Sequence, residues 1–395
     1  MDTGLQTRIS ESITKAKNGT ITADILIRLV NDCLDQSPDR EIIHQFLDLA
    51  HFQSVSKIIS KANLTEDWLK RVVQLIDHSQ YHTGTLIEQR AKRYGKKTVF
   101  KIIRGENLQT VSYSDLWSKI QMTGKALSVL EKPENPPIIG LLTYNQLNGV
   151  LVDLACLSFG FRVIPIPLNS TNEHLSFILK QSKVTHLFVG GKTAIRLWND
   201  VQPSHTISVI AFNNPNLIHG NVTEWNTFFD NRDRAQNFNV NQRMSYVSMD
   251  RTQTIMYTSG STANPKGITF TQKNLISKRF ARALALPEFG SGDTFLCYLP
   301  LFHTFGRYFE LMGSIFWGAT YSFAESPAFN SLLKDFLMVN PTIFISIPKR
   351  WVQLYEMLEE QLNLDSDESD IIQKKIKSIT GGKLNWGLSA AGYLD

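Results

Sequence analysis

The first 80 residues carry apolar side chains at helical spacing. The stretch ITADILIRLVNDCLDQ places five of them on one helical face: Ile25, Leu26, Leu29, Val30 and Leu34. Two further stretches before residue 80 repeat this spacing, and each is predicted to form a helix with one buried face. Thr65 is the predicted N-cap of the last helix. We interpret residues 1–80 as an all-helical extension, either a small module or a segment packed on the next domain.

From Tyr81 onward the pattern changes to strands that alternate with helices. Two runs rich in β-branched and aromatic residues, 98–103 and 108–113, flank the turn RGEN and predict a hairpin. A helix follows, with Ser114 as its predicted N-cap, and then apolar strands and helical stretches take turns. This alternation predicts an α/β fold in which helices cover mostly parallel sheets. Residues 81–395 are assigned to this domain, with a loop-rich stretch at 213–250 that contains one short helix.

Composition excludes several classes of protein. The chain has 395 residues, of which 42% are hydrophobic and 19% charged, so a mainly disordered protein is excluded. The net charge of +5 is spread along the whole length, so nucleic acid is not an expected partner. The three cysteines are far apart, which excludes a disulfide scaffold and favours a reducing compartment.

Membrane-spanning and secreted proteins are also disfavoured. No window reaches the ~20 mainly apolar residues that a spanning helix needs. The amino terminus has charges throughout and lacks the apolar core of a secretory signal. We therefore expect a cytoplasmic protein without a transmembrane segment, for which peripheral contact with a membrane stays open.

The most informative stretch is TQTIMYTSGSTANPKGITFTQKNL, in which a short apolar strand runs into a loop of small and polar residues. The candidate phosphate-binding residues of this loop are Thr258, Ser259, Gly260, Ser261, Thr262, Lys266 and Gly267. Glycines let the backbone approach an anion, hydroxyls donate to phosphate oxygens, and lysine adds a mobile positive charge. We therefore predict a site for a nucleoside triphosphate. The alternative is a surface turn rich in serine and glycine.

This loop differs from the P-loop pattern G-x-x-x-x-G-K-[ST]. Pro265 stands at the position of the second glycine, and Gly267 stands at the position of the final hydroxyl residue. The chain is therefore not expected to be a P-loop NTPase of the usual kind.

Several segments resemble the adenylate-forming (AMP-binding) acyl-CoA synthetase superfamily. YTSGSTANPKG is similar to its signature Y-T-S-G-[ST]-T-G-x-P-K-G, with Ala263 as the one departure, and FTQKNL is similar to L-T-H-x-N-L, with Gln272 at the histidine. LPLFHTFGRYFEL is similar to the long-chain fatty acid–CoA ligase segment L-P-L-x-H-x-F-x-R, with Gly306 where glutamate is frequent. With VNPTIFISIPKRWVQLYE and the final LSAAGYLD, the resemblance extends over about 81–395.

The resemblance implies an AMP-forming acyl-CoA synthetase that uses ATP, Mg²⁺ and coenzyme A. A fatty carboxylate, of long-chain type, would attack the α-phosphate of ATP to give an acyl-adenylate and pyrophosphate, and the thiol of coenzyme A would then displace AMP. The implied phosphate-binding residues are Thr258 to Thr262 and Lys266, and Thr258 is also the implied Mg²⁺ ligand.

The resemblance also assigns residues to the acyl and adenine ends of the site. His303 would lie beside the acyl carboxylate and Phe305 would line the nearby pocket. Arg307 is either a solvated helix residue or a partner of a phosphate or carboxylate. The turn that packs on the adenine would comprise Ala391, Gly392 and Tyr393.

The family's later motifs have no counterpart in this sequence. These are Y-G-x-T-E, the ribose-binding aspartate, and a C-terminal domain that carries a lysine for the adenylation transition state. Because the loss of such electrostatic stabilisers typically costs ~10²–10³ in rate each, the chain alone is expected to be weak or inactive. Two alternatives stay open: a non-catalytic protein that binds nucleotide or acyl chains, and a fatty acyl-AMP ligase that loads a carrier protein. The acyl chain length, the oligomeric state and the role of residues 1–80 are left undetermined.

Overall fold

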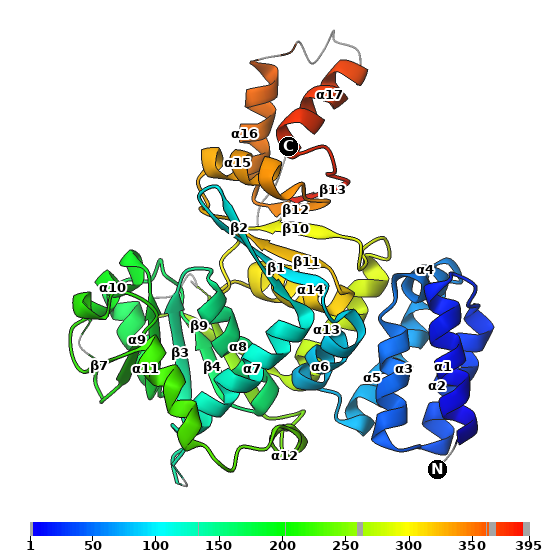
Figure 1. Cartoon of the computed structure of the whole chain (residues 1–395), viewed down its shortest axis with the longest axis horizontal. Coiled ribbons are helices and arrows are strands. Elements are labelled where there is room, and N and C mark those ends of the chain that lie inside the picture. Colours follow the sequence, from blue (N-terminus) through cyan, green and yellow to red (C-terminus); the bar gives the residue numbers. More distant parts are fainter. Residues whose placement is uncertain are drawn as a thin grey trace. The chain divides into compact units, whose positions relative to one another are not determined.

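The computed structural model describes residues 3–132, 134–201, 203–258, 264–360, 362 and 369–389. These residues form two compact units. Unit 1 comprises Met1–Arg93 and Ser114–Phe289, and unit 2 comprises Tyr94–Tyr113 and Gly290–Asp395. Each unit contains one β-sheet with its own helices, and each is described by itself (Figure 1).

The amino-terminal part of unit 1 is helical, as predicted. Its helices are α1 (Thr3–Lys17), α2 (Ala23–Gln36), α3 (Arg40–Ala50), α4 (Gln53–Lys61), α5 (Thr65–Ser79) and α6 (Thr83–Tyr94). Figure 1 shows α1 to α5 as a bundle, coloured blue. The apolar face predicted for the second helix is buried at Leu26, Leu29 and Val30. Helix α5 begins at Thr65 itself and Leu64 takes the N-cap position, one residue earlier than predicted.

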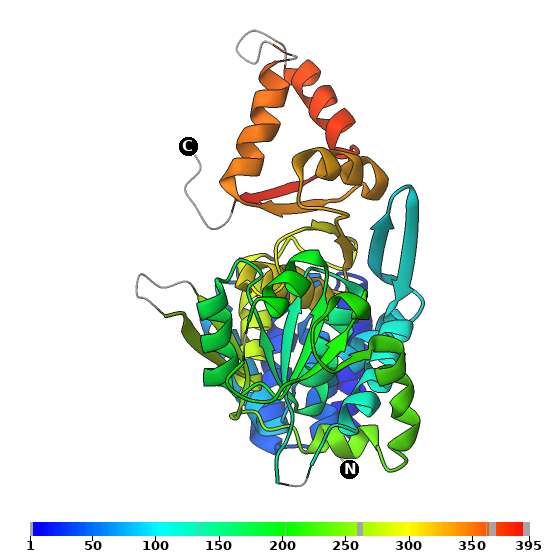
Figure 2. The same ribbon diagram turned by 90° about the vertical axis from the view of Figure 1, so that its left-hand side faces the viewer.

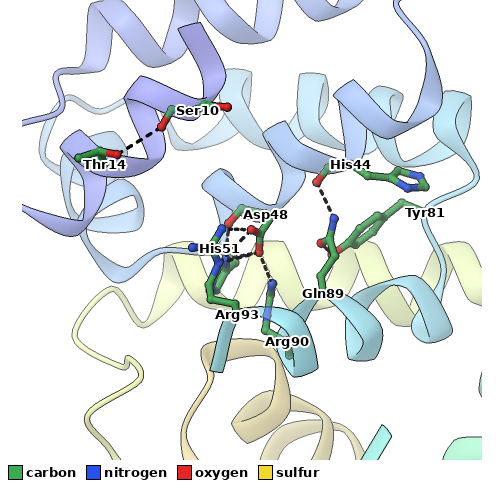
Figure 3. A network of polar contacts seen from close by, with 9 residues as sticks. All are labelled: Ser10, Thr14, His44, Asp48, His51, Tyr81, Gln89, Arg90 and Arg93. Carbon is green, nitrogen blue, oxygen red and sulfur yellow. Dashed lines mark hydrogen bonds and ion pairs between the residues drawn. The ribbon is translucent and has the colours of Figure 1, made fainter. Parts of the chain in front are cut away.

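A buried ion-pair network joins α3 to α6 (Figure 3). The carboxylate of Asp48 accepts a hydrogen bond from Arg90 Nη1 at 2.7 Å and from Arg93 Nε at 2.9 Å. His51 Nδ1 lies 3.5 Å from the same carboxylate. Burial alone would raise the pKa of Asp48, but the hydrogen bond from Arg93 and the positive charges around it lower that pKa below its ordinary value. The network therefore ties the amino-terminal helices to the helix that follows them.

The rest of unit 1 is built on a seven-stranded sheet in the order β7-β6-β5-β3-β4-β8-β9. Its strands are β3 (Ile138–Thr143), β4 (Arg162–Pro165), β5 (His186–Gly190), β6 (Ser208–Ala211), β7 (Val222–Glu224), β8 (Thr252–Thr258) and β9 (Lys266–Thr271). Neighbouring strands are parallel except β8 and β9, which form an antiparallel pair at one edge.

The helices that accompany this sheet follow the predicted alternation. They are α7 (Tyr113–Ser128), α8 (Leu147–Phe159), α9 (Asn172–Ser182), α10 (Lys192–Asn199), α11 (Trp225–Asp230), α12 (Val240–Ser245) and α13 (Gln272–Ala285). Helix α7 already includes Ser114, so the predicted N-cap lies inside the helix. The stretch 213–250 contains the short helix α11, as predicted, and also β7 and α12, which were not predicted.

Unit 2 is built on a six-stranded sheet in the order β13-β12-β10-β11-β1-β2. Its strands are β1 (Thr98–Arg104), β2 (Asn107–Ser112), β10 (Thr294–Cys297), β11 (Thr320–Phe323), β12 (Ile343–Ser346) and β13 (Trp386–Ser389). The predicted hairpin is the antiparallel pair β1–β2, drawn in cyan at one edge of this sheet in Figures 1 and 2. The remaining pairs are parallel. The structure thus confirms an α/β fold in which mostly parallel sheets are covered by helices.

The helices of unit 2 lie in the connections between its strands. They are the π-helix η3 (Phe305–Leu311), α14 (Met312–Trp317), α15 (Phe329–Val339), α16 (Pro348–Glu359) and α17 (Ser369–Thr380). The core under α15 includes Leu332, Phe336 and Phe344. Within the described ranges, none of the helices is long and apolar enough to cross a membrane.

The buried histidine before α6 predicts a loss of stability in acid. His82 Nδ1 accepts a hydrogen bond from Gly84 N at 3.1 Å, which requires the neutral ring. Burial, with a smaller contribution from the charge of His44, lowers the pKa of His82 to about 4. Between pH 4 and about 6.5 this histidine is protonated in the unfolded chain but neutral in the folded one. The free energy of unfolding is therefore highest above this range and falls by about 3 kcal/mol as the pH is lowered to 4.

Chemical denaturation between pH 4 and 7 checks this expectation. The variant His82→Asn keeps an acceptor for Gly84 N but does not titrate, and it should show a shallower dependence on pH. The exposed His78 provides the control, since His78→Asn should leave the slope unchanged. Equal slopes for wild type and His82→Asn would contradict the assignment.

Candidate functional site

The β8–β9 hairpin brings together the two ends of the predicted phosphate loop. Thr258, the last residue of β8, is the cross-strand partner of Lys266, the first residue of β9, and both side chains are exposed. Ser259, Gly260, Ser261 and Thr262 lie outside the described residues. An exposed hydroxyl and an exposed ammonium group therefore stand side by side at the open end of the hairpin, where they can contact an anion.

The strands beneath this end are held by buried polar contacts. The hydroxyl of Thr254 in β8 donates to Val163 O of β4 at 2.6 Å. Tyr257 Oη donates to Gln181 Oε1 at 2.9 Å. These bonds fix β8 in the parallel sheet, so Thr258 extends from a rigid strand.

Packing against β8 explains why glycine stands at position 267, which the sequence alone did not show. A Cβ atom at this position would lie 2.9 Å from Ile255 Cγ2 and 3.2 Å from the ring of Tyr257. A larger residue would therefore clash with these two side chains of β8 unless they shifted. The glycine thus has a packing role beside Lys266, whether or not its backbone also contacts phosphate.

Helix α13 starts directly at the end of β9. Thr271 is its N-cap, and a capping box forms because Thr271 Oγ1 accepts from Asn274 N at 3.2 Å while Asn274 Oδ1 accepts from Thr271 N at 3.0 Å. Gln272 is fully buried: its Oε1 accepts from Thr83 Oγ1 at 2.7 Å and its Nε2 donates to Leu157 O at 2.6 Å. The start of α13 is therefore fixed on two sides.

The second group of predicted site residues lies in unit 2, in and just before η3. His303 is exposed, its ring stacks on Phe305 at 6.1 Å, and its carbonyl accepts from Arg307 N at 3.0 Å. Phe305 is half-buried and begins η3. A π-helix inserts an extra residue into each turn and is often found at functional sites.

Arg307 corrects one of the two interpretations made from the sequence. Its side chain has no exposed surface, its Nη1 donates to Tyr308 Oη at 3.0 Å, and its guanidinium lies over the Tyr308 ring at 5.2 Å. The interpretation of Arg307 as a solvated helix residue is therefore wrong, because its side chain is fully buried. Its role as partner of a phosphate or carboxylate stays a prediction.

Gly306 shows why the frequent glutamate is absent at this position. A Cβ atom here would lie 2.4 Å from the carbonyl oxygens of both Leu299 and Pro300. These are backbone atoms, which cannot move aside as a flexible side chain can. The turn of chain before η3 therefore requires glycine.

Glu310, on the same π-helix, was not identified from the sequence. It is fully buried, and neither carboxylate oxygen has a hydrogen-bond partner among the described residues. Burial raises its pKa well above the ordinary value, because no charged or hydrogen-bonding partner in the described part of the chain offsets the loss of solvation. Only its burial sets it apart, and the sequence gives no sign of that burial.

The remaining candidate residues are those of the adenine turn and the Mg²⁺ ligand. Ala391, Gly392 and Tyr393 lie outside the described residues, which end with β13. Among the described residues no group of three or more His, Cys, Asp or Glu side chains could hold a metal ion. The exposed Thr258 hydroxyl is a hard oxygen donor, and it fits Mg²⁺ because this ion commonly takes one or two protein oxygens together with substrate phosphates.

The comparison with protein families decides the assignment. The model of the AMP-binding enzyme family matches residues 87–386, which is most of the chain and includes both groups of candidate residues. The chain belongs to the AMP-binding enzyme family.

Relatives of this AMP-binding chain include acyl-CoA synthetases. Long chain acyl-CoA synthetase 7 (peroxisomal) of Arabidopsis thaliana is 24% identical over 68% of this chain and 38% of its own length. Fatty acyl-CoA synthetase A of Dictyostelium discoideum is 26% identical over 71% of this chain and 40% of its own length. The chain thus spans about two fifths of the length of these curated relatives.

Solved structures agree on the fold of this AMP-binding chain. The adenylation domain of the carboxylate reductase from Mycobacterium chelonae is 17% identical, with a TM-score of 0.65, over 80% of this chain and 54% of that chain. The N-terminal domain of FACL13 from Mycobacterium tuberculosis is 14% identical, with a TM-score of 0.57, over 80% of this chain and 71% of that chain.

Proposed function

We propose that this chain binds ATP at the β8–β9 hairpin and is the ATP-binding part of an AMP-forming ligase. The fatty acid, of long-chain type, would be activated to an acyl-adenylate and then transferred to coenzyme A. The observation that carries the proposal is the pairing of exposed Thr258 with exposed Lys266 at the end of the hairpin, within the range matched by the family.

In this proposal the residues of unit 1 bind and orient the triphosphate. Lys266 supplies a positive charge to the β- and γ-phosphates, and the hydroxyls of Thr258, Ser259, Ser261 and Thr262 donate to phosphate oxygens. Gly260 and Gly267 allow the backbone to come close to the anion. Mg²⁺, held in part by Thr258, would neutralise phosphate charge when bound. The adenine would pack on Ala391, Gly392 and Tyr393.

The residues of unit 2 are proposed to orient the fatty acid. His303 would hydrogen-bond the carboxylate, and the Phe305 ring, which stacks on His303, would contact the first carbons of the chain. The buried side chain of Arg307 would stabilise the start of η3. Its positive charge would also attract the carboxylate of the fatty acid.

Two measurements on the 395-residue chain test the proposal. Calorimetry with ATP and Mg²⁺ measures nucleotide binding, and fatty-acid-dependent exchange of pyrophosphate into ATP measures adenylate formation. Binding together with exchange supports the ligase. Exchange at any chain length of fatty acid rejects the non-catalytic alternative, whereas binding without exchange is expected from an ATP-binding part that is weak or inactive alone. Absence of ATP binding rejects the proposal. Coenzyme A and acyl carrier protein, tested as acceptors, distinguish the ligase from a carrier-loading enzyme.

His303 provides a separate test of the fatty acid site. The variant His303→Ala should lower the rate of fatty-acid-dependent exchange by about tenfold, because one hydrogen bond to a charged group is lost. The affinity for ATP should stay unchanged, since no triphosphate contact is removed. His219→Ala is the control, because His219 is an exposed histidine of unit 1 outside the proposed site. Equal losses in both variants would contradict the role of His303.

A further inference from the structure

Strand β9, which carries Lys266, is an edge strand with only one neighbour in its sheet. Among the strands that the structure describes it lies beside β8 alone, and residues Lys266 to Thr269 are all exposed. The other end of β9 runs without a loop into α13 through the Thr271 capping box. The position of Lys266 therefore depends on two supports, the β8 ladder and helix α13.

Helix α13 is in turn contacted at both ends and in the middle by the amino-terminal segment. At its start, Lys273 Nζ pairs with Asp77 Oδ2 of α5 at 2.6 Å. In the middle, the ring of Phe280 meets the ring of Tyr81 edge to face, with centroids 6.3 Å apart.

Beyond the last turn of α13, Glu288 Oε2 pairs with Lys57 Nζ of α4 at 2.7 Å. The carbonyl oxygen of Glu288 also accepts a hydrogen bond from Gln53 Nε2. Helices α4 and α5 thus both pack against α13, and Tyr81 adds a contact between its two ends.

These contacts assign a role to a part of the chain that lies outside the family match. We propose that the amino-terminal helices brace α13 and thereby position Lys266 for the triphosphate, with Asp77 as a positioning residue. The inference rests on the proposed binding of ATP at Lys266. Binding sites need their charged groups held to within about 0.5 Å by supporting contacts, and β9 has one strand and one helix to supply them.

Asp77 is a suitable place for the test because its side chain is partly exposed and its replacement should not prevent folding. The Asp77–Lys273 pair has side-chain exposures of 42% and 35%, so the pair adds little to overall stability. The variant Asp77→Lys places two positive charges together and should loosen the contact between α5 and the first turn of α13. We expect the affinity for ATP to fall about fivefold, with the thermal midpoint within about 3 °C of wild type.

Three comparison variants make the result specific. Asp67→Asn breaks the Asp67–Arg71 pair on the same helix α5 and should leave the affinity for ATP unchanged. The exchanged pair Asp77→Lys with Lys273→Asp should restore the affinity to within about twofold of wild type, because the attraction is re-formed. In a Lys266→Ala background, Asp77→Lys should have no further effect, because the brace acts through Lys266.

The outcomes separate failure of the brace from failure of the ATP site. If Lys266→Ala weakens ATP binding but Asp77→Lys does not, the brace is rejected and the proposed function stands. If the losses from Asp77→Lys and Lys266→Ala add independently, the brace through Lys266 is also rejected. If Lys266→Ala has no effect on ATP affinity, the ATP site itself is wrong and the brace is rejected with it.

Discussion

The variant Asp48→Ala is expected to lower the free energy of unfolding of unit 1 by about 3–5 kcal/mol. Asp48 is the carboxylate shared by Arg90 and Arg93, and Arg90 has no exposed side-chain surface. Removing the carboxylate leaves the Arg90 charge buried without its counter-ion, and this desolvation cost is not recovered by water. Thermal unfolding followed by circular dichroism measures the effect as a drop of many degrees in the midpoint.

The pair Arg8–Asp32 provides the matched control in the same group of helices. Its side chains are 43% and 25% exposed, so the variant Asp32→Ala should cost no more than about 1 kcal/mol. A loss of similar size in both variants would show that the Asp48 network is no stronger than a surface pair. The role assigned to it, as the link between α3 and α6, would then be withdrawn.

The variant Lys266→Ala should weaken the binding of ATP by about ten- to a hundredfold. A hydrogen bond that involves charged groups contributes about 1.5–3 kcal/mol, which corresponds to this range of affinity. The side chain is exposed on an edge strand, so its removal leaves no cavity and no buried polar group. Calorimetric titration with ATP and Mg²⁺ should therefore show a weaker site in a protein with an almost unchanged thermal midpoint.

A control variant at an exposed lysine elsewhere in unit 1 shows whether the loss of affinity is specific to Lys266 or follows from the lower net charge of the chain. Lys278 lies on α13, and Lys278→Ala removes the same charge from the chain without touching the hairpin. Its affinity for ATP should equal that of wild type. A collapsed melting curve for Lys266→Ala, or an unchanged affinity, would reject the assignment of the loop to phosphate binding.

Lys266→Ala tests ligand binding, whereas Asp48→Ala tests the stability of the fold. Lys266 stands at the surface, where a charge is available to a ligand and contributes little to folding. The negative charge of Asp48 is buried, and there it pairs with the arginines of α6. The contrast follows from solvation. Water stabilises an exposed charge, so the loss of its partner costs little free energy, whereas a buried charge that loses its partner is left without any stabilising group.

Features that depend on neighbouring residues in the chain were determined by the sequence. The helical spacing before residue 80, the β1–β2 hairpin and the alternation of strands and helices were predicted correctly, because their periodicity is a local property. The phosphate-binding role of the loop from Thr258 to Gly267 is a prediction that also rests on a local property, since its residue types are consecutive. The family match over 87–386 agrees with the resemblance found in these motifs.

Features that depend on burial and on distant partners were decided only by the tertiary structure. Asp48 and Arg90 are 42 positions apart, and no pattern in either helix indicates that they meet. The burial of Arg307 shows that its interpretation as a solvated residue is wrong. The burial of the Glu310 carboxyl group has no signal in the sequence. Periodicity shows which face of a helix is apolar, but it does not show what covers that face. The partners of α13 and the surroundings of η3 are set by long-range packing, and a single sequence does not encode them in any local pattern.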